Sequence, residues 1–159
     1  MKKIISIISA LFLTLIFTSC AEKEKVDTSQ APAEIKDAIE MSYQLSKQLT
    51  EMQVTAGSDK VINAEEISGI AVAFKKLAIV NNYNLKNFKD SKYFIALNKE
   101  RKNEYDALAE KVVFLKDCEG YDALGLEVQK IALEVKDVTE LPVEEPVVEE
   151  TTEEAEVVN

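Results

Sequence analysis

Apolar residues recur at steps of three or four positions through most of residues 32–138, and this period constrains the fold more than any other feature of the sequence. Such spacing places apolar side chains on one face of an α-helix. β-branched residues follow the same spacing, and hardly any alternate with the period of two that is typical of strands. The sequence therefore predicts an all-α protein.

The first predicted helix covers residues 32–54. Pro32 suits its first turn, because the N–H that proline lacks would have no partner there. Its predicted buried face consists of Ile35, Ile39, Ser42, Leu45, Leu49 and Met52. The sequence Ala56-Gly57-Ser58 is expected to end it.

The second predicted helix begins after Asn63, which is a good N-cap residue, and Glu66 completes a capping box. Ile62 and Ile67 are spaced for a hydrophobic staple. The buried face then runs through Ile67, Ile70, Phe74, Leu77 and Asn81. We expect Asn81-Asn82 to end this helix and residues 83–90 to form a connector.

The third predicted helix starts near Asp90 or Ser91 and has an unbroken apolar stripe as far as Leu115. Gly120 is expected to follow it in the left-handed conformation that often ends a helix. The fourth predicted helix covers residues 122–138.

Four amphipathic helices with short connections bury their apolar faces best as an antiparallel four-helix bundle, which we place at residues 32–138. Residues 20–31 are polar and are expected to form a flexible tether. Residues 139–159 contain eight Glu and no Lys or Arg. Because like charges repel, this acidic C-terminal tail is predicted to be disordered.

The first residues are typical of a secretory signal peptide, which we place at residues 1–19. Lys2 and Lys3 precede an apolar run over residues 4–17, too short for the roughly 20 residues of a membrane span. The following Phe17-Thr18-Ser19-Cys20 resembles the lipobox of bacterial lipoprotein signal peptides. An ordinary signal peptide with a chance Cys, or an uncleaved anchor, is the alternative.

The resemblance implies cleavage before Cys20 and acylation of Cys20, with palmitate as a suitable label. The chain would then be a lipoprotein attached to a membrane of the bacterial cell envelope by its lipid anchor. Ala21 follows the Cys, and in this family that permits delivery to the outer membrane. Exposure to the periplasm or to the cell surface stays open.

The composition excludes several classes of site. The chain has no His, 2 Cys and 4 Gly, so it lacks a His-dependent triad, a Cys or His metal cluster and a glycine-rich phosphate loop. Its net charge of −10 argues against a nucleic-acid partner. Residues 55–66 faintly resemble a calcium-binding loop, but Lys60 stands where that loop needs glycine. We therefore expect no metal and no cofactor.

One segment is a candidate interaction surface. Residues 86–102 have six cations and two carboxylates, a local charge of 6 − 2 = +4, with aromatic residues between them. We define the basic surface as Lys86, Lys89, Lys92, Lys99 and Lys102 with Tyr83 and Phe88. Such a surface suits anionic lipid headgroups, an envelope glycan or an acidic envelope protein. The alternative is a solvated face whose aromatic residues belong to the core.

Two further residues stand on the stripe of the third predicted helix. Cys118 is either a small buried side chain or a free thiol that joins a second chain. Arg101 either extends its guanidinium to the solvent or pairs with a carboxylate on a facing helix.

These features predict a small lipid-anchored envelope lipoprotein whose helical bundle is a non-catalytic binding or assembly module. The alternative is a carrier that holds a small apolar ligand or lipid between its helices, which would require an apolar pocket. An enzyme with carboxylate, Lys or Tyr chemistry is the third and least favoured interpretation.

Overall fold

The computed structural model describes residues 26–141, which form five α-helices and two short 3₁₀ helices. The α-helices are α2 (Ala33–Ala56), α3 (Ala64–Phe88), α4 (Lys92–Glu100), α5 (Lys102–Lys111) and α6 (Tyr121–Val135), and the 3₁₀ helices are η1 (Thr28–Gln30) and η2 (Val113–Asp117). Within residues 26–141 there is no strand beyond one isolated bridge between Val61 and Glu119. The all-α prediction is confirmed for these residues. The predicted signal peptide, Cys20 and residues 142–159 lie outside them.

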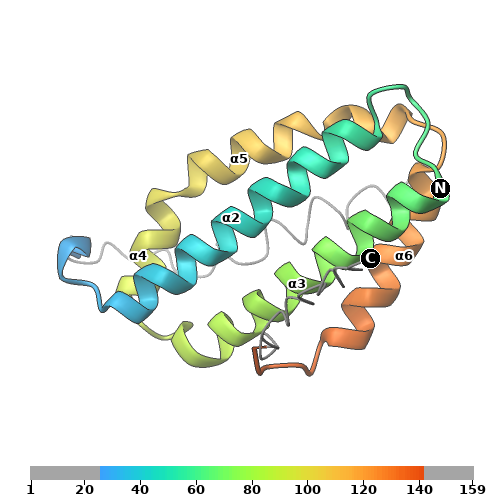
Figure 1. The fold of residues 1–159 in the computed structure, drawn as a ribbon. Helices are drawn as coiled ribbons and strands as arrows, with labels where there is room; N and C mark the ends of the chain where they lie inside the picture. Colours follow the sequence, from blue (N-terminus) through green and yellow to red (C-terminus); the bar gives the residue numbers. More distant parts are fainter. Residues whose placement is uncertain (1–25, 142–159) are drawn as a thin grey trace, which may run out of the picture.

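The long helices α2 and α3 lie side by side at the centre of the described chain (Figure 1). Helices α4 and α5 pack on α2, whereas α6 packs on α3. The two outer parts of the structure are therefore attached to different central helices.

Buried apolar side chains form two clusters. The larger one joins α2, α3, η2 and α6 through residues such as Leu49, Ile70 and Leu124. The smaller one consists of Ile35, Ile39 and Phe94. Helices α4 and α5 together contribute only two of the fully buried residues, Phe94 and Leu108. Few buried apolar contacts consequently hold α4 and α5 against the other helices.

The predicted end of the second helix at Asn81-Asn82 is wrong. Helix α3 continues through both residues to Phe88, and the predicted connector at residues 83–90 is mostly helical. Leu77, Val80 and Asn84 are buried on this stretch. Packing against α2 and α6 therefore overrides the weak helix propensity of asparagine.

The third predicted helix is interrupted twice. The backbone leaves regular α-helix at Arg101 (φ −82°, ψ 0°) and again at Val112 (φ −106°, ψ 2°), which separates α4, α5 and η2. The separate pieces place Phe94 in the smaller cluster and Leu115 in the larger one. An unbroken apolar period thus does not require one straight helix.

The loop between α2 and α3 is joined to the segment that enters α6. The Ile62 N–H donates to the Glu119 carbonyl at 2.8 Å, and the Glu119 N–H donates to the Lys60 carbonyl at 2.9 Å. Gly120 is left-handed as predicted (φ 86°), and a Cβ there would lie 2.2 Å from the Ile62 oxygen. Gly120 directly precedes α6, however, and the third predicted helix has already ended at Lys111.

The predicted capping box is confirmed at the start of α3. The Asn63 Oδ1 atom accepts hydrogen bonds from the Glu65 and Glu66 N–H groups, and the Glu66 carboxylate accepts one from the Asn63 N–H at 2.9 Å. These bonds satisfy N–H groups that a helix leaves unpaired at its beginning.

Part of the predicted flexible tether is ordered in the structure. Asp27 caps η1, Ala31 is buried, and the Thr28 hydroxyl donates to Glu100 at 3.0 Å. Residues 27–31 are therefore held against the folded part, although their polar sequence suggested a free segment.

Candidate functional site

A cleft of about 250 Å³ lies between the central helices and the outer ones. Helix α3 supplies the largest share of its lining, with further residues from α2, α4, α5 and α6. The lining consists of Ile39, Ser42, Ser46, Phe74, Leu77, Ala78, Asn81, Asn82, Asn84, Leu85, Phe94, Asn98, Tyr105, Ala132, Val135 and Lys136. The mostly apolar lining with a few polar groups resembles that of small-ligand sites, and the volume lies just below their usual range of roughly 300 to 1,000 Å³.

Three asparagines of α3 point in different directions around the cleft. The Asn84 amide donates to the Ala38 carbonyl of α2 at 3.0 Å. The Asn82 amide donates to the Val135 carbonyl at the end of α6 at 2.6 Å. At about 100° per residue, Asn82 lies about 100° to one side of Asn81 and Asn84 lies about 60° to the other side. Asn81 is therefore between them on the helix surface. Asn84 and Asn82 thus connect α3 to α2 and to α6, and Asn81 lies between these two contacts.

Asn84 and Asn81 are also linked through Ser42. The Asn84 amide donates to the Ser42 hydroxyl at 2.8 Å, and that hydroxyl donates to the Asn81 Oδ1 atom at 3.0 Å. Within residues 26–141, no acceptor meets the Asn81 Nδ2 group. The hydrogen-bond chain therefore ends on Asn81, whose Nδ2 N–H groups have no acceptor among the described residues and are open to the solvent of the cleft.

The buried face of α2 is unusually polar in its middle. Ser42, Ser46, Thr50 and Gln53 are at most 7% exposed. The Ser46 hydroxyl donates to the Ser42 carbonyl, but the Thr50 Oγ1 and Gln53 Oε1 atoms have no hydrogen-bond partner among the described residues. Met52, predicted for this face, is 39% exposed instead. Buried polar groups of this kind cost stability. Ser42 and Ser46 line the cleft and favour a binding role there, whereas Thr50 and Gln53 do not line it.

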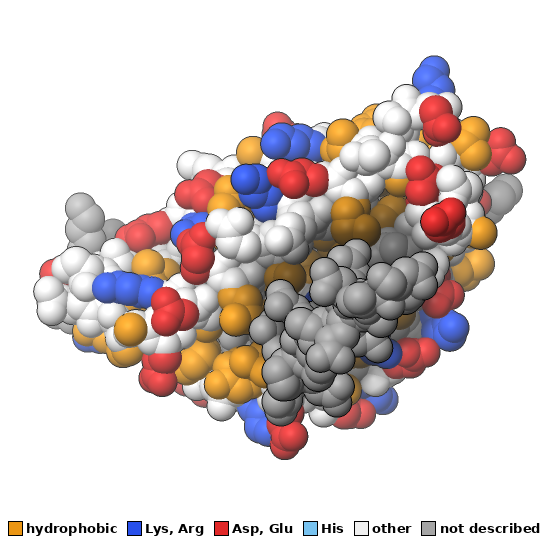
Figure 2. All heavy atoms as spheres, viewed as in Figure 1, with side chains coloured by type: hydrophobic (Ala, Val, Ile, Leu, Met, Phe, Trp, Pro, Cys, Tyr) orange, Lys and Arg blue, Asp and Glu red, His pale blue; other side chains and the backbone are white. Residues whose placement is uncertain are grey.

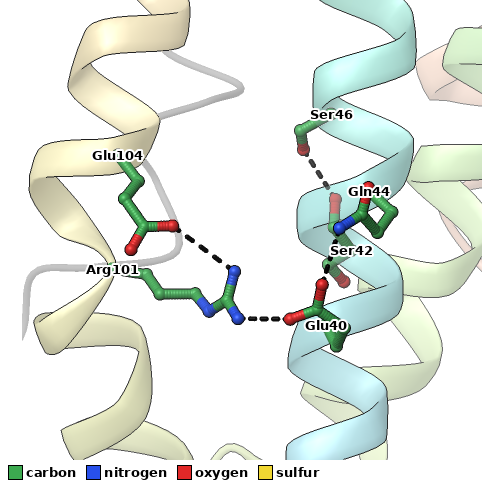
Figure 3. Close-up of polar contacts among 6 residues, drawn as sticks. All are labelled: Glu40, Ser42, Gln44, Ser46, Arg101 and Glu104. Atoms are coloured by element: carbon green, nitrogen blue, oxygen red, sulfur yellow. Dashed lines mark hydrogen bonds and ion pairs between the residues drawn. The ribbon is translucent and has the colours of Figure 1, made fainter.

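Arg101 connects the outer helices to α2 beside the cleft (Figure 3). Its guanidinium pairs with Glu40 of α2 and with Glu104 of α5, the latter at 3.4 Å. It also lies over the ring of Tyr43, 4.5 Å from the centroid, which is a cation–π geometry. Of the two alternatives for Arg101, the structure shows the contact with a carboxylate on a facing helix, and the partner is Glu40.

The pKa values of two residues around Arg101 are displaced. A hydrogen bond from Gln44, together with Arg101, lowers the pKa of Glu40 below its ordinary value. Burial raises the pKa of Tyr105 to about 12. Tyr105 lines the cleft and packs edge-on against Tyr43 with centroids 5.7 Å apart. At neutral pH its phenol is therefore protonated and can donate a hydrogen bond.

The residues of the basic surface lie at the end of α3 and along α4 as far as the start of α5. Lys86, Lys89, Lys92 and Lys99 are exposed, and Lys102 is half-buried and paired with Asp106. The Lys86 ammonium donates to the Thr139 hydroxyl at 2.8 Å, so the first residue of the predicted tail lies against it. The use of these lysines by a partner stays a prediction.

The aromatic residues near the basic surface belong largely to the interior. Tyr83 contacts the ring of Phe88 edge-on, and Phe88 packs beside Phe94 in the smaller apolar cluster. This arrangement favours the alternative in which aromatic residues of this segment serve the core. In Figure 2, charged side chains of both signs are spread over the visible face, with apolar ones gathered between them.

Cys118 is buried at 8% exposure within the larger apolar cluster. Its Sγ atom lies 3.7 Å from the Gly57 carbonyl oxygen. This is the position expected of a small buried side chain. A link through Cys118 to a second chain stays a prediction, which the burial disfavours.

Residues 26–141 contain neither a candidate metal site nor a candidate membrane span. No three Cys, Asp or Glu residues within residues 26–141 are grouped so that they could hold a metal ion. None of the helices in that range combines the length and hydropathy that a membrane span requires.

No protein-family description matches the chain, and comparisons with curated proteins and with solved structures find no significant similarity.

The cleft was not predicted as a specific site, although the sequence contains a signal for it. Ser42 and Asn81 stand on the predicted buried faces of their helices, where a purely structural stripe would carry apolar residues. Polar residues at the centre of two facing stripes indicate a hydrogen bond or a polar cavity between them. The interpretation of Asn81-Asn82 as a helix end concealed this signal.

Proposed function

We propose that this protein is a lipid-anchored lipoprotein of the bacterial cell envelope that works by binding rather than by catalysis. Its ligand is a small molecule held in the cleft. The observation that carries the proposal is the cleft itself, in which the unused Asn81 donors lie among apolar side chains such as Phe74 and Leu77. This combination suits recognition of a ligand that is partly apolar.

The pKa of Tyr105, one of the titratable residues that line the cleft, supports binding over catalysis. General acids and bases are usually tuned towards the working pH. The pKa of Tyr105 is instead raised to about 12, away from neutrality. In the proposed function Tyr105 is a hydrogen-bond donor to the ligand.

The proposed architecture is an antiparallel four-helix bundle that is incompletely closed. Helices α2, α3 and α6 are three of its members, and the succession α4, α5 and η2 takes the place of the third predicted helix. The support is that α5 packs on α2 and α6 packs on α3. In this arrangement the cleft is the space left where the bundle fails to close.

A larger side chain that fills the cleft tests the binding function. Ala78 lines the cleft on α3, whereas Val72 on the same helix is 57% exposed. Native mass spectrometry of protein purified from envelopes should find a bound small molecule on the wild type and on Val72→Phe. Ala78→Phe should be folded by circular dichroism and carry none. A wild type that neither retains nor acquires a small molecule from envelope extract would reject the function.

The membrane anchor is tested separately. Labelled palmitate should be incorporated into the wild type and not into Cys20→Ala, since Cys20 is the proposed acylation site. Equal labelling of the two proteins would remove the lipoprotein assignment and leave the cleft unaffected. The proposed location is the outer membrane, with the side of exposure left open.

A further inference from the structure

We propose that the cleft takes a neutral amphiphile: a small molecule with an apolar chain or ring and one uncharged hydrogen-bonding group, such as an amide or ester. This inference rests on the proposed function, because it names the chemical class of the ligand that the cleft holds.

The hydrogen-bond chain in the cleft determines whether the polar group of the ligand must donate or accept a hydrogen bond. Asn84 donates to Ser42, and Ser42 donates to the Asn81 Oδ1 atom, so the acceptor of Asn81 is used and its donors are not. A chain of donors polarises its members in the same sense, which strengthens the final N–H groups as donors. The complementary ligand group is therefore an acceptor, as in a carbonyl.

The charges around the cleft argue against an ionised ligand. Among the described residues that line it, Lys136 alone has a formal charge, and its side chain is 65% exposed, so water screens its ammonium. Lys136 is also the residue at the C-terminal end of α6, where the helix dipole is negative. A buried anion would thus meet little net positive charge, and a buried cation would meet no lining carboxylate. Either ion would lose hydration without compensation.

The remaining walls suit an apolar group of limited size. Phe74 and Leu77 of α3 and Val135 of α6 are buried at the cleft. The cleft volume of about 250 Å³ lies below the roughly 300 to 1,000 Å³ of most ligand pockets. The apolar part is consequently a short chain or a single ring rather than the full length of a membrane lipid.

Three probes that differ only in their end group test the ligand class. Octanamide is neutral, octanoate is an anion and octylammonium is a cation at pH 7. Binding to the full-length Cys20→Ala protein, which lacks the proposed acyl anchor, is measured without detergent from the side-chain amide signals of the asparagines by NMR titration. We expect octanamide to bind with a Kd at least tenfold lower than either ion, with the largest shift at Asn81.

A matched pair of variants tests the role of Asn81. Asn81→Leu keeps the size of the side chain and removes the donors, so the affinity for octanamide should fall about tenfold. Asn87→Leu is the control, since Asn87 is exposed on the same helix and does not line the cleft. Its affinity for octanamide should be unchanged.

The outcomes separate the two proposals. If octanoate or octylammonium binds as tightly as octanamide, or if Asn81→Leu folds and binds octanamide normally, the ligand class is wrong while the cleft remains a binding site. If none of the probes shifts the asparagines of the cleft, and native protein carries no small molecule, the proposed function itself fails. The comparison of probes uses the unaltered cleft, so it decides the ligand class even if Asn81→Leu does not fold.

Discussion

Arg101, at the break between α4 and α5, is ion-paired with Glu40 of α2, a residue 61 positions earlier in the chain. The pair connects the lightly packed outer helices to the centre of the structure at the edge of the cleft. Those helices contribute Phe94, Asn98 and Tyr105 to the lining of the cleft. The stability of the pair therefore bears on the binding site.

Replacing Arg101 should loosen that attachment. Arg101→Met removes the pairing with both carboxylates and the contact with Tyr43, so the free energy of unfolding should fall by about 1 to 2 kcal/mol. Lys99→Met is the control, because Lys99 is exposed on α4 and should change stability by less than about 0.5 kcal/mol. Urea denaturation measures both. Equal effects would mean that the contacts of Arg101 contribute nothing specific.

The stability that Glu40 contributes should depend on pH. The pKa of Glu40 is lowered in the folded protein, so the ionised form favours folding. This contribution is present above the ordinary pKa of Glu and is lost as the pH falls through the lowered value. Because the Glu40 side chain is about half exposed, we expect the free energy of unfolding of the wild type to exceed that of Glu40→Gln by only about 0.5 kcal/mol at pH 7.

Denaturation of both proteins between pH 7 and pH 3 tests this expectation. The difference should persist above about pH 5 and shrink towards pH 3, since the ordinary pKa of Glu is about 4.3. A difference that does not change across this range would show that the ionisation of Glu40 is not linked to folding.

The two glycines Gly120 and Gly69 should respond oppositely to alanine. A Cβ at Gly120 would lie 2.2 Å from the Ile62 oxygen in a left-handed backbone, so Gly120→Ala should cost at least about 2 kcal/mol. A Cβ at Gly69, within α3, would lie 3.5 Å from the Met52 Cε atom, an ordinary contact. Gly69→Ala should therefore raise stability by about 0.5 to 1 kcal/mol through helix propensity. Thermal unfolding gives both values, and a tolerated Gly120→Ala would contradict the close approach of the two loops.

Thr50 should be replaceable with a gain in stability. Its hydroxyl is buried without a partner, so Thr50→Val should raise the free energy of unfolding by about 1 kcal/mol. Thr55→Val on the same helix is the control, since the Thr55 hydroxyl is exposed and donates to the Glu51 carbonyl. Its effect should stay within about 0.5 kcal/mol. A clear loss of stability in Thr50→Val would mean that the hydroxyl is satisfied in solution.

The fold class could be predicted because local periodicity and capping decide it. The apolar period gave the helical content, and the Asn63–Glu66 capping box is a contact over three residues whose geometry follows from the residue types. The conformation of Gly120 was also correctly expected. These features depend on neighbours in the sequence.

The cleft could not be predicted because its contacts are distant in the sequence. The Asn82 amide donates a hydrogen bond to Val135, and the Asn84 amide donates to Ala38 and Ser42. Each of these bonds offsets the poor helix propensity of asparagine only after the helices have packed. The break at Arg101 is similar, since the apolar stripe continues across it and its polar partner Glu40 lies on another helix.

The central claim is that a small neutral molecule occupies the cleft, and intermolecular nuclear Overhauser effects test it most directly. With octanamide bound to the isotope-labelled full-length protein, cross-peaks should join the octyl chain to Phe74, Leu77 and Val135, which line the cleft. Leu126 and Leu133 provide the contrast, because they are 62% and 70% exposed on α6. Cross-peaks to these two leucines with none to the cleft residues would contradict the account.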